Sequence, residues 1–215
     1  MGGERVGLRE RKKQQTRREL ADAALRLFSE RGYATTSVAD IAAAAGVSTR
    51  TFFAYFPSKD DALFADTDER LALMHGLLRD LPAGTAPIRA FREIVQRIFT
   101  AAASDLVGPH QQSRLRLIME EPGLQGRALH RLLAAQQQIA RDLVDAFDGA
   151  LAETDAVMIT GAVVGALVGV ALHGMERGED AASMRAAMTR AIDQLERGLG
   201  QVGAGSDGAG SAQQR

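Results

Sequence analysis

Three polar side chains stand in a row at Thr49, Arg50 and Thr51, directly after Ser48, a residue type that caps helix N-termini. Side chains in the first turn of a helix can hydrogen-bond a ligand, and an arginine fork can hold the O6 and N7 atoms of guanine together. Phe52 follows, and another phenylalanine comes four residues later, which predicts an apolar side that docks the helix. The spacing therefore predicts a helix whose polar start is presented for recognition.

A second short helix is expected just before this one. Ser37 and Asp40 can form a capping box, with Asp in place of the usual Glu or Gln. Apolar residues recur at helical spacing from 38 to 45, and Gly46 permits the left-handed conformation that ends a helix. Two short helices joined by a glycine turn form the layout of a DNA-reading helix-turn-helix, although a helical hairpin that binds no nucleic acid has the same pattern.

The flanking residues extend this pattern from Leu20 to Leu63. The marks are Ala24, Phe28, Gly32, Tyr33, Thr36, Ser37, Val38, Asp40, Ile41, Ala42, Ala45, Gly46, Val47, Ser48, Thr51, Phe52, Phe53, Tyr55, Phe56, Ser58 and Lys59. In this segment the chain resembles the DNA-binding domain of the TetR family of bacterial transcriptional regulators. The remainder resembles the family only in length and helical content.

The resemblance implies which side chains would contact DNA. The base-reading set is Thr49, Arg50, Thr51 and Phe53, and the phosphate-contacting set is Thr36, Ser37, Tyr55 and Lys59. Arg50 is the best candidate for sequence specificity, while core packing is the alternative role for Phe53. Ala39 and Ala54 depart from the family pattern, in which longer side chains often occupy these positions, so specificity is expected to rest on a narrow set.

The resemblance and the helical periodicity together predict an all-α fold of about nine helices. Its parts are a flexible basic N-terminal arm at 1–13, a three-helix DNA-binding domain at 14–60, a helical effector-binding and dimerisation domain at 61–198, and a flexible Gly-rich tail at 199–215. Helices are expected near 14–31, 58–81, 87–107, 109–121, 124–148, 156–175 and 181–198, in addition to the two short ones.

The positive charge is concentrated at the N-terminal end. Residues 1–60 carry eleven Lys or Arg and seven Asp or Glu, whereas the whole chain has a formal net charge of −1. Seven cations precede the first apolar repeat, where they could reach phosphates or a neighbouring minor groove. They are Arg5, Arg9, Arg11, Lys12, Lys13, Arg17 and Arg18. The alternative is a solvated basic tail.

The segment from Ala156 to Met175 has twenty residues without a charged side chain, with glycines at 161, 165 and 169. A transmembrane helix is one interpretation, but both flanks are acidic and neither carries an interfacial Trp or Tyr. The resemblance implies instead that this helix pairs with the last one in a four-helix homodimer interface. The candidate interface residues are Gly161, Gly165, Leu167, Val168, Leu172, Met184, Met188, Ile192 and Leu195.

By family analogy, the helices between these two regions would hold a small-molecule effector. Candidate pocket residues are Phe91, Ile94, Ile98, Arg114, Leu115, Ile118, Met119, Leu143 and Phe147. Ordinary core packing is the alternative role for the apolar ones. Arg114 could meet an anionic head group, with a surface salt bridge as its alternative.

Composition argues against several other classes. The chain has no cysteine, and its four histidines stand far apart without metal-ligand spacing, so neither a metal site nor a catalytic site is expected and no cofactor is predicted. The charged N-terminus does not resemble a secretion leader, which favours a cytoplasmic protein. An enzyme is therefore not expected.

Taken together, the sequence predicts a homodimeric transcriptional repressor that binds a palindromic double-stranded operator and is released by an unidentified small-molecule effector. The alternative is a helical ligand-binding or protein-interaction module without sequence-specific DNA binding.

Overall fold

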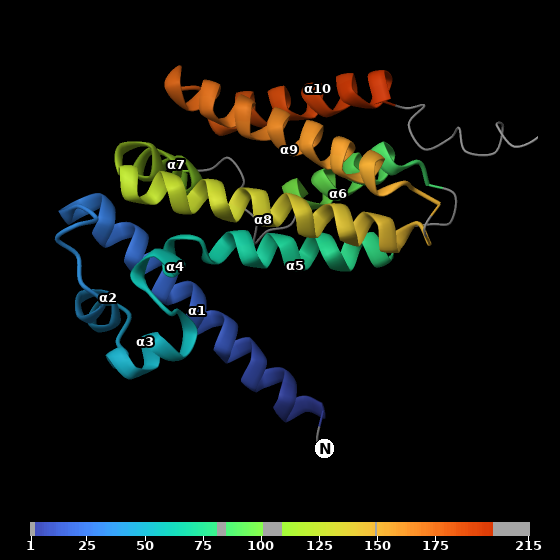
Figure 1. The fold of residues 1–215 in the computed structure, drawn as a ribbon. Helices are drawn as coiled ribbons and strands as arrows, with labels where there is room; N and C mark the ends of the chain where they lie inside the picture. The colour runs from blue at the N-terminus through green and yellow to red at the C-terminus, as the bar shows by residue number, and fades with distance from the viewer. Residues whose placement is uncertain (1–2, 81–84, 101–108, 149, 200–215) are drawn as a thin grey trace, which may run out of the picture. The chain divides into compact units, whose positions relative to one another are not determined.

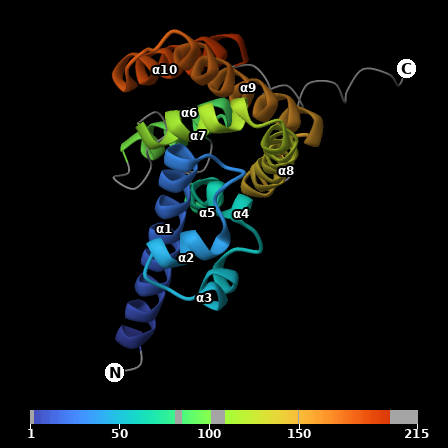
Figure 2. The same ribbon diagram turned by 90° about the vertical axis from the view of Figure 1, so that its left-hand side faces the viewer.

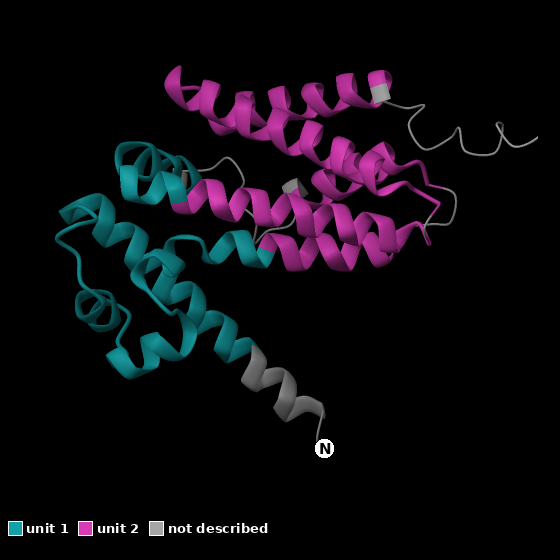
Figure 3. Ribbon diagram, in the orientation of Figure 1, with its two compact units in different colours: residues 1–69, 110–126 teal, residues 70–109, 127–215 magenta. Residues whose placement is uncertain are grey.

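A computed structural model describes residues 3–80, 85–100, 109–148 and 150–199, with side chains described except at 3–10, 99, 100, 109 and 199. Within these ranges the regular structure consists of ten α-helices, α1 to α10 (Figure 1). The predicted all-α class is confirmed. The chain forms two compact units, one of residues 1–69 and 110–126, and one of residues 70–109 and 127–215 (Figure 3).

The first unit is built around α1 (Gly3–Arg31), which packs against α2 (Val38–Ala44) and α4 (Lys59–Leu63), while α2 packs against α3 (Thr49–Tyr55) (Figure 2). Most of α7 (Pro109–Glu120) and the start of α8 (Pro122–Ala146) also belong to this unit. Its core consists of side chains from all four N-terminal helices, including Leu20, Ala24, Phe28, Ile41, Phe52, Phe56 and Leu63.

The predicted caps define the ends of α2 and α3. The Ser37 hydroxyl accepts from the Asp40 backbone N–H at 3.2 Å, and the Asp40 carboxylate accepts from the Ser37 N–H at 2.9 Å, so the capping box is complete. Gly46 ends α2 with a φ of +68°, a conformation that favours glycine. The Ser48 hydroxyl then accepts from the Thr51 N–H at 3.1 Å and begins α3.

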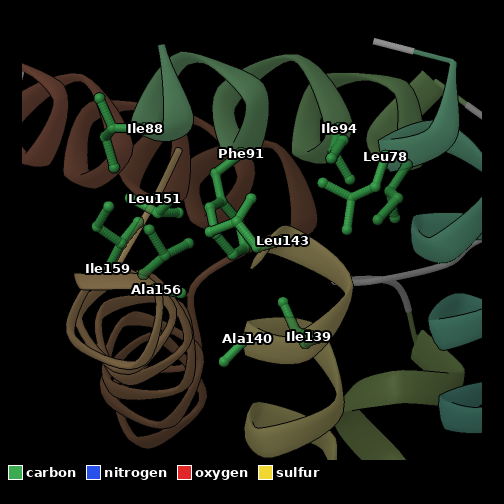
Figure 4. Close-up of a cluster of buried hydrophobic side chains, with 12 residues drawn as sticks. Leu78, Ile88, Phe91, Ile94, Ile139, Ala140, Leu143, Leu151, Ala156 and Ile159 are labelled. Carbon is green, nitrogen blue, oxygen red and sulfur yellow. The ribbon is translucent and has the colours of Figure 1, made fainter. Parts of the chain in front are cut away.

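The second unit contains most of α5 (Ala65–Arg79) and of α8, together with α6 (Pro87–Thr100), α9 (Glu153–Glu176) and α10 (Ala181–Leu199). Its core joins α5, α6, α8 and α9 through buried side chains such as Leu78, Phe91, Ile94, Leu143 and Ile159 (Figure 4). α10 packs on α9 and α6, and Arg92 of α6 pairs with Glu196 of α10 at 3.0 Å.

Several helix boundaries differ from those predicted. The helix expected from 58 to 81 is divided at Phe64 into α4 and α5, which brings the number of helices to ten. α1 begins at Gly3 rather than near 14, so the segment expected as an arm is largely helical. α8 begins at Pro122, because proline suits the first helical position, where its missing N–H is not needed. The end of the helix predicted to reach 107 and nearly all of the predicted tail lie outside the described residues.

The compact units also follow a different division from the predicted domains, since α7 joins the N-terminal helices. Packing units and functional domains need not coincide, and the boundaries at 14–60 and 61–198 stay a prediction.

Candidate nucleic-acid interface

One side of α3 is anchored in the first unit and the other is presented to solvent. Phe52 is fully buried and packs against Phe56, with ring centroids 5.7 Å apart. Thr49 and Arg50 are exposed, and Phe53 exposes 57 % of its surface. Core packing therefore does not explain Phe53. One side of α3 is therefore packed in the core, and the other side exposes Thr49, Arg50 and Phe53.

Thr51 lies at the edge of that face. It is half-buried, and its hydroxyl lies 2.9 Å from the Ser48 hydroxyl that caps the helix. A hydroxyl both donates and accepts, so Thr51 can support the cap and still reach a ligand.

Thr36 is not available as a side-chain phosphate contact. Its side chain is only 2 % exposed, and its hydroxyl donates to the carbonyl of Gly32 at 2.8 Å and lies 3.3 Å from the carbonyl of Leu27. The hydroxyl hydrogen therefore stabilises the turn after α1. The prediction that this hydroxyl contacts a phosphate is corrected accordingly. The physical reason is that the end of α1 leaves carbonyl groups without intrahelical donors.

Lys59 is also held inside the fold. Its ammonium donates to the carbonyls of Tyr33 at 2.7 Å and Thr36 at 2.9 Å, and it lies 4.1 Å from the centroid of the Tyr33 ring. Tyr33 in turn donates its hydroxyl to Asp60. Two of the three ammonium hydrogens are therefore committed to the segment between α1 and α2, and at most one remains for a phosphate.

The other two predicted phosphate residues keep accessible groups. Ser37 is exposed, but its hydroxyl donates to Asp40 and accepts from the Asp40 N–H, so its role in the capping box comes first. Tyr55 is half-buried, and its carbonyl accepts from Arg17 at 3.3 Å.

Two of the N-terminal cations are used within the first unit. Arg17 pairs with Asp68 at 2.7 Å, and its guanidinium carbon lies 4.6 Å from the centroid of the Phe56 ring. Arg18 pairs with Glu69 at 3.0 Å, and the hydrogen bonds between them raise the pKa of Arg18. In this conformation acidic side chains at the start of α5 hold both arginines, so a phosphate would have to compete with Asp68 and Glu69 for them.

The predicted effector residues do not form one set. Phe91, Ile94, Ile98 and Leu143 are buried in the core of the second unit, with Phe147 against it, as their alternative role predicted. Leu115, Ile118 and Met119 lie on α7 in the first unit, and Met119 is 48 % exposed. The candidate effector residues are thus divided between the two units.

Arg114 forms a salt bridge, the role considered as its alternative, although its own side chain is buried while that of its partner Asp66 is 41 % exposed. It is 5 % exposed, and it donates to Asp66 at 2.6 Å and to Gln111 at 2.8 Å. It thus ties α7 to the first turn of α5 within the first unit. Its Nε atom has no hydrogen-bond partner. An anionic ligand would have to compete with Asp66 for this guanidinium.

The three glycines of α9 share an open face. A Cβ atom added to Gly161, Gly165 or Gly169 would meet nothing within 4 Å. By length and composition α9 is one helix in the described part of the chain that could cross a membrane, and 22 % of its apolar stretch is buried. The rest of α9 is half-buried or exposed, and the face with the three glycines is open, which indicates a surface that another chain or an apolar phase could cover.

The last helix contributes less to that surface than predicted. Met184, Met188 and Ile192 are buried within the chain, where the two methionines pack against α9. The glycine that allows this close packing is Gly174, where a Cβ atom would lie 2.6 Å from the Met184 Cγ atom. These three side chains are therefore removed from the predicted dimer interface. Gly174 is not among the predicted interface glycines, because it follows Gly169 by five residues whereas the other three are spaced by four.

The profile of bacterial regulatory proteins of the tetR family matches residues 20–65, and the profile of the MftR C-terminal domain matches residues 85–200. The chain belongs to the TetR family. A proposed mycofactocin biosynthesis transcriptional regulator of Mycobacterium tuberculosis, MftR, is 29 % identical over 92 % of this chain and 96 % of its own length.

Two solved TetR-type structures have a similar fold. SmeT, the repressor of a Stenotrophomonas maltophilia multidrug efflux pump, superposes with a TM-score of 0.56 at 18 % identity, over 85 % of this chain and 89 % of its own. FadR of Thermus thermophilus, a TetR-family repressor in complex with lauroyl-CoA, gives a TM-score of 0.51 at 23 % identity, over 82 % of this chain and 92 % of its own.

This TetR-family protein is a DNA-binding transcriptional regulator, and its relatives are named regulators rather than enzymes. In the ranges that the structure describes, no group of three or more His, Cys, Asp or Glu side chains could hold a metal ion.

Proposed function

We propose that this regulator is a homodimeric repressor that reads a palindromic operator with α3 and leaves it when a small-molecule effector binds. The observation that carries the DNA-reading part is the free face of α3. Arg50 is exposed while Phe52, on the opposite side of the helix, is fully buried, and Thr49 in the first turn is exposed as well. A side chain that reads bases must be accessible, and its helix must be held rigidly behind it.

The open face of α9 supports the dimer. A helix with three glycines on one side lets a second helix approach closely, and burial of its apolar surface would stabilise the pair. A two-fold dimer presents two copies of α3, so its operator should be a palindrome whose half-sites lie about 34 Å apart or a multiple of that.

Release by an effector requires a ligand that binds the free geometry better than the DNA-bound one. FadR, which has a similar fold, was solved with lauroyl-CoA, and this ligand was observed for FadR alone. For this chain we propose an effector without assigning its class. The same proposal places the protein in the cytoplasm, where operator DNA is found.

The experiment that tests this proposal is selection of bound duplexes from a random DNA pool by the purified protein. The Arg50→Ala variant is compared in parallel with Arg116→Ala, which removes an exposed arginine of α7. We expect the parent and Arg116→Ala to enrich the same palindrome. We expect Arg50→Ala to lose it, or to relax it at one base position in each half-site, because a bidentate contact to guanine contributes about 1–3 kcal/mol of discrimination.

Failure to enrich any sequence at low salt, by a protein shown to be folded and dimeric, would overturn the operator-reading proposal. The interaction-module alternative would then be preferred.

A further inference from the structure

The N-terminal part of α1 carries cations that the fold itself does not use. α1 has 29 residues, and among its described side chains, from residue 11 on, the first buried one is Leu20. Arg11, Lys12 and Lys13 all lie in the helix before that point and are exposed. These three adjacent cations are therefore accessible to an anionic partner outside the chain.

The structure sorts the α1 cations into two groups. Arg17 and Arg18 are paired with Asp68 and Glu69. Among the side chains that the structure describes, Arg11, Lys12 and Lys13 have no hydrogen bond or ion pair with a protein group. A phosphate does not have to displace a protein partner to reach this second group, whereas at Arg17 and Arg18 it does.

One residue of this group, Lys13, lies one helical turn from Arg17, which contacts the end of the DNA-reading helix. Arg17 touches the C-terminal end of α3, because it donates to the Tyr55 carbonyl and stacks on Phe56. Lys13 precedes Arg17 by four residues, so it lies on the same face of α1, about 6 Å further along the axis. Figure 2 shows α1 running past α3 in this direction. Lys13 thus extends beyond Tyr55, a residue expected to contact phosphate.

We propose that the turn containing Arg11, Lys12 and Lys13 is a second DNA-binding surface, which contacts backbone phosphates next to the base pairs read by α3. This inference rests on the proposed operator binding. Because this segment is helical, it cannot enter the minor groove as an extended arm could. A helix is about 10–12 Å across with its side chains, whereas the minor groove of B-DNA is about 6 Å wide. The segment therefore follows the phosphates and adds affinity without sequence preference.

The first test measures the salt dependence of operator binding. Each phosphate contact contributes about 0.9 to the slope of log K against log salt concentration on B-DNA. We expect the triple variant R11Q/K12Q/K13Q to lower the slope by up to about 0.9 per lost contact in each protomer. The ratio of affinities for operator and scrambled duplexes should stay unchanged, since phosphate contacts carry no sequence information.

The matched control is R79Q/R116Q/R190Q, which removes the same charge from three exposed arginines on α5, α7 and α10. If both triple variants lower the slope equally, the net charge explains the effect and the proposed local surface is contradicted. If the N-terminal variant keeps the parent slope while still selecting the operator, this inference fails and the proposed function stands. Loss of sequence-specific binding by the parent protein would instead remove the proposed function itself.

A second readout comes from lysine chemistry. The chain has three lysines, Lys12, Lys13 and Lys59. Acetylation followed by mass spectrometry, with and without saturating operator, should show Lys12 and Lys13 protected by DNA. Lys59 donates to two carbonyls and should react slowly even without DNA, so the readout rests on Lys12 and Lys13 alone. Equal acetylation of Lys12 and Lys13 in the two samples would overturn the proposal.

Discussion

At the scale of single residues, the features that begin and end the short helices are local, while the roles of the basic side chains are not. Ser37, Asp40 and Ser48 bond to groups three residues away. Lys59 bonds to the carbonyls of residues 26 and 23 positions earlier. Substitutions that remove the local contacts therefore test how α2 forms, and a substitution of Lys59 tests what holds the segment between α1 and α2.

Replacing Ser37 with Ala removes the capping box of α2. We expect a loss of about 1 kcal/mol in the free energy of unfolding, measured by urea denaturation, because one helix N–H loses its acceptor. Ser113→Ala, at an exposed position inside α7, is the control and should change little. An unchanged stability in Ser37→Ala would show that the cap contributes nothing.

The same cap gives stability a defined pH dependence. Hydrogen bonds from Ser37 lower the pKa of the Asp40 carboxyl. A carboxyl with a depressed pKa in the folded state stabilises the fold above its unfolded pKa, about 3.9, and this contribution is lost as the pH falls through the folded pKa. NMR titration of the Asp40 carboxyl should show its pKa move back toward the ordinary value in Ser37→Ala. An Asp40 pKa that is the same in both proteins would contradict this assignment.

Replacing Lys59 with Met separates a structural role from a phosphate contact. The substitution leaves the Tyr33 and Thr36 carbonyls without this donor, and we expect a loss of about 1–3 kcal/mol in the free energy of unfolding. Weaker DNA binding with undiminished stability would instead restore the phosphate role predicted from the sequence.

At the scale of elements, the pairing of α9 with α10 depends on one close approach. An alanine at Gly174 would place its Cβ atom 2.6 Å from Met184, which is only 2 % exposed and has little room to move. Gly76 of α5, in contrast, faces open space. The two glycines therefore have opposite expectations although both lie inside helices.

We expect Gly174→Ala to destabilise the protein by about 1–3 kcal/mol, as overpacking does, despite the better helix propensity of alanine. Gly76→Ala should stabilise it by up to about 1 kcal/mol. Thermal unfolding of both variants provides the measurement. A Gly174→Ala protein as stable as the parent would mean that Met184 repacks freely.

At the scale of the whole molecule, we expect the open face of α9 to decide the oligomeric state. Burying a charged carboxylate there without a partner is costly, so we expect Gly165→Glu to convert a dimer into a monomer in sedimentation velocity and to abolish tight operator binding. Ala134→Glu, at an exposed position of α8, is the control. A parent protein that is monomeric, and that floats with lipid vesicles, would favour the membrane interpretation of α9 instead.

The sequence by itself determined the helical class, the position of the helix-turn-helix and the caps of α2 and α3, because these depend on residues within one or two turns of each other. It also indicated α9 as an apolar helix with small residues, from composition alone. Arg50 and Phe53 could be proposed as exposed because α3 needs a buried side for Phe52 and Phe56.

Only the tertiary structure decided which cations the fold uses. Arg17 and Arg18 meet Asp68 and Glu69, partners 51 residues away, so no local pattern distinguishes them from Lys12 and Lys13. Thr36 is likewise buried only when the chain folds. The same holds for Met184 of α10, which packs against α9. Contacts between distant segments are set by packing geometry, which a periodic pattern along the chain does not contain.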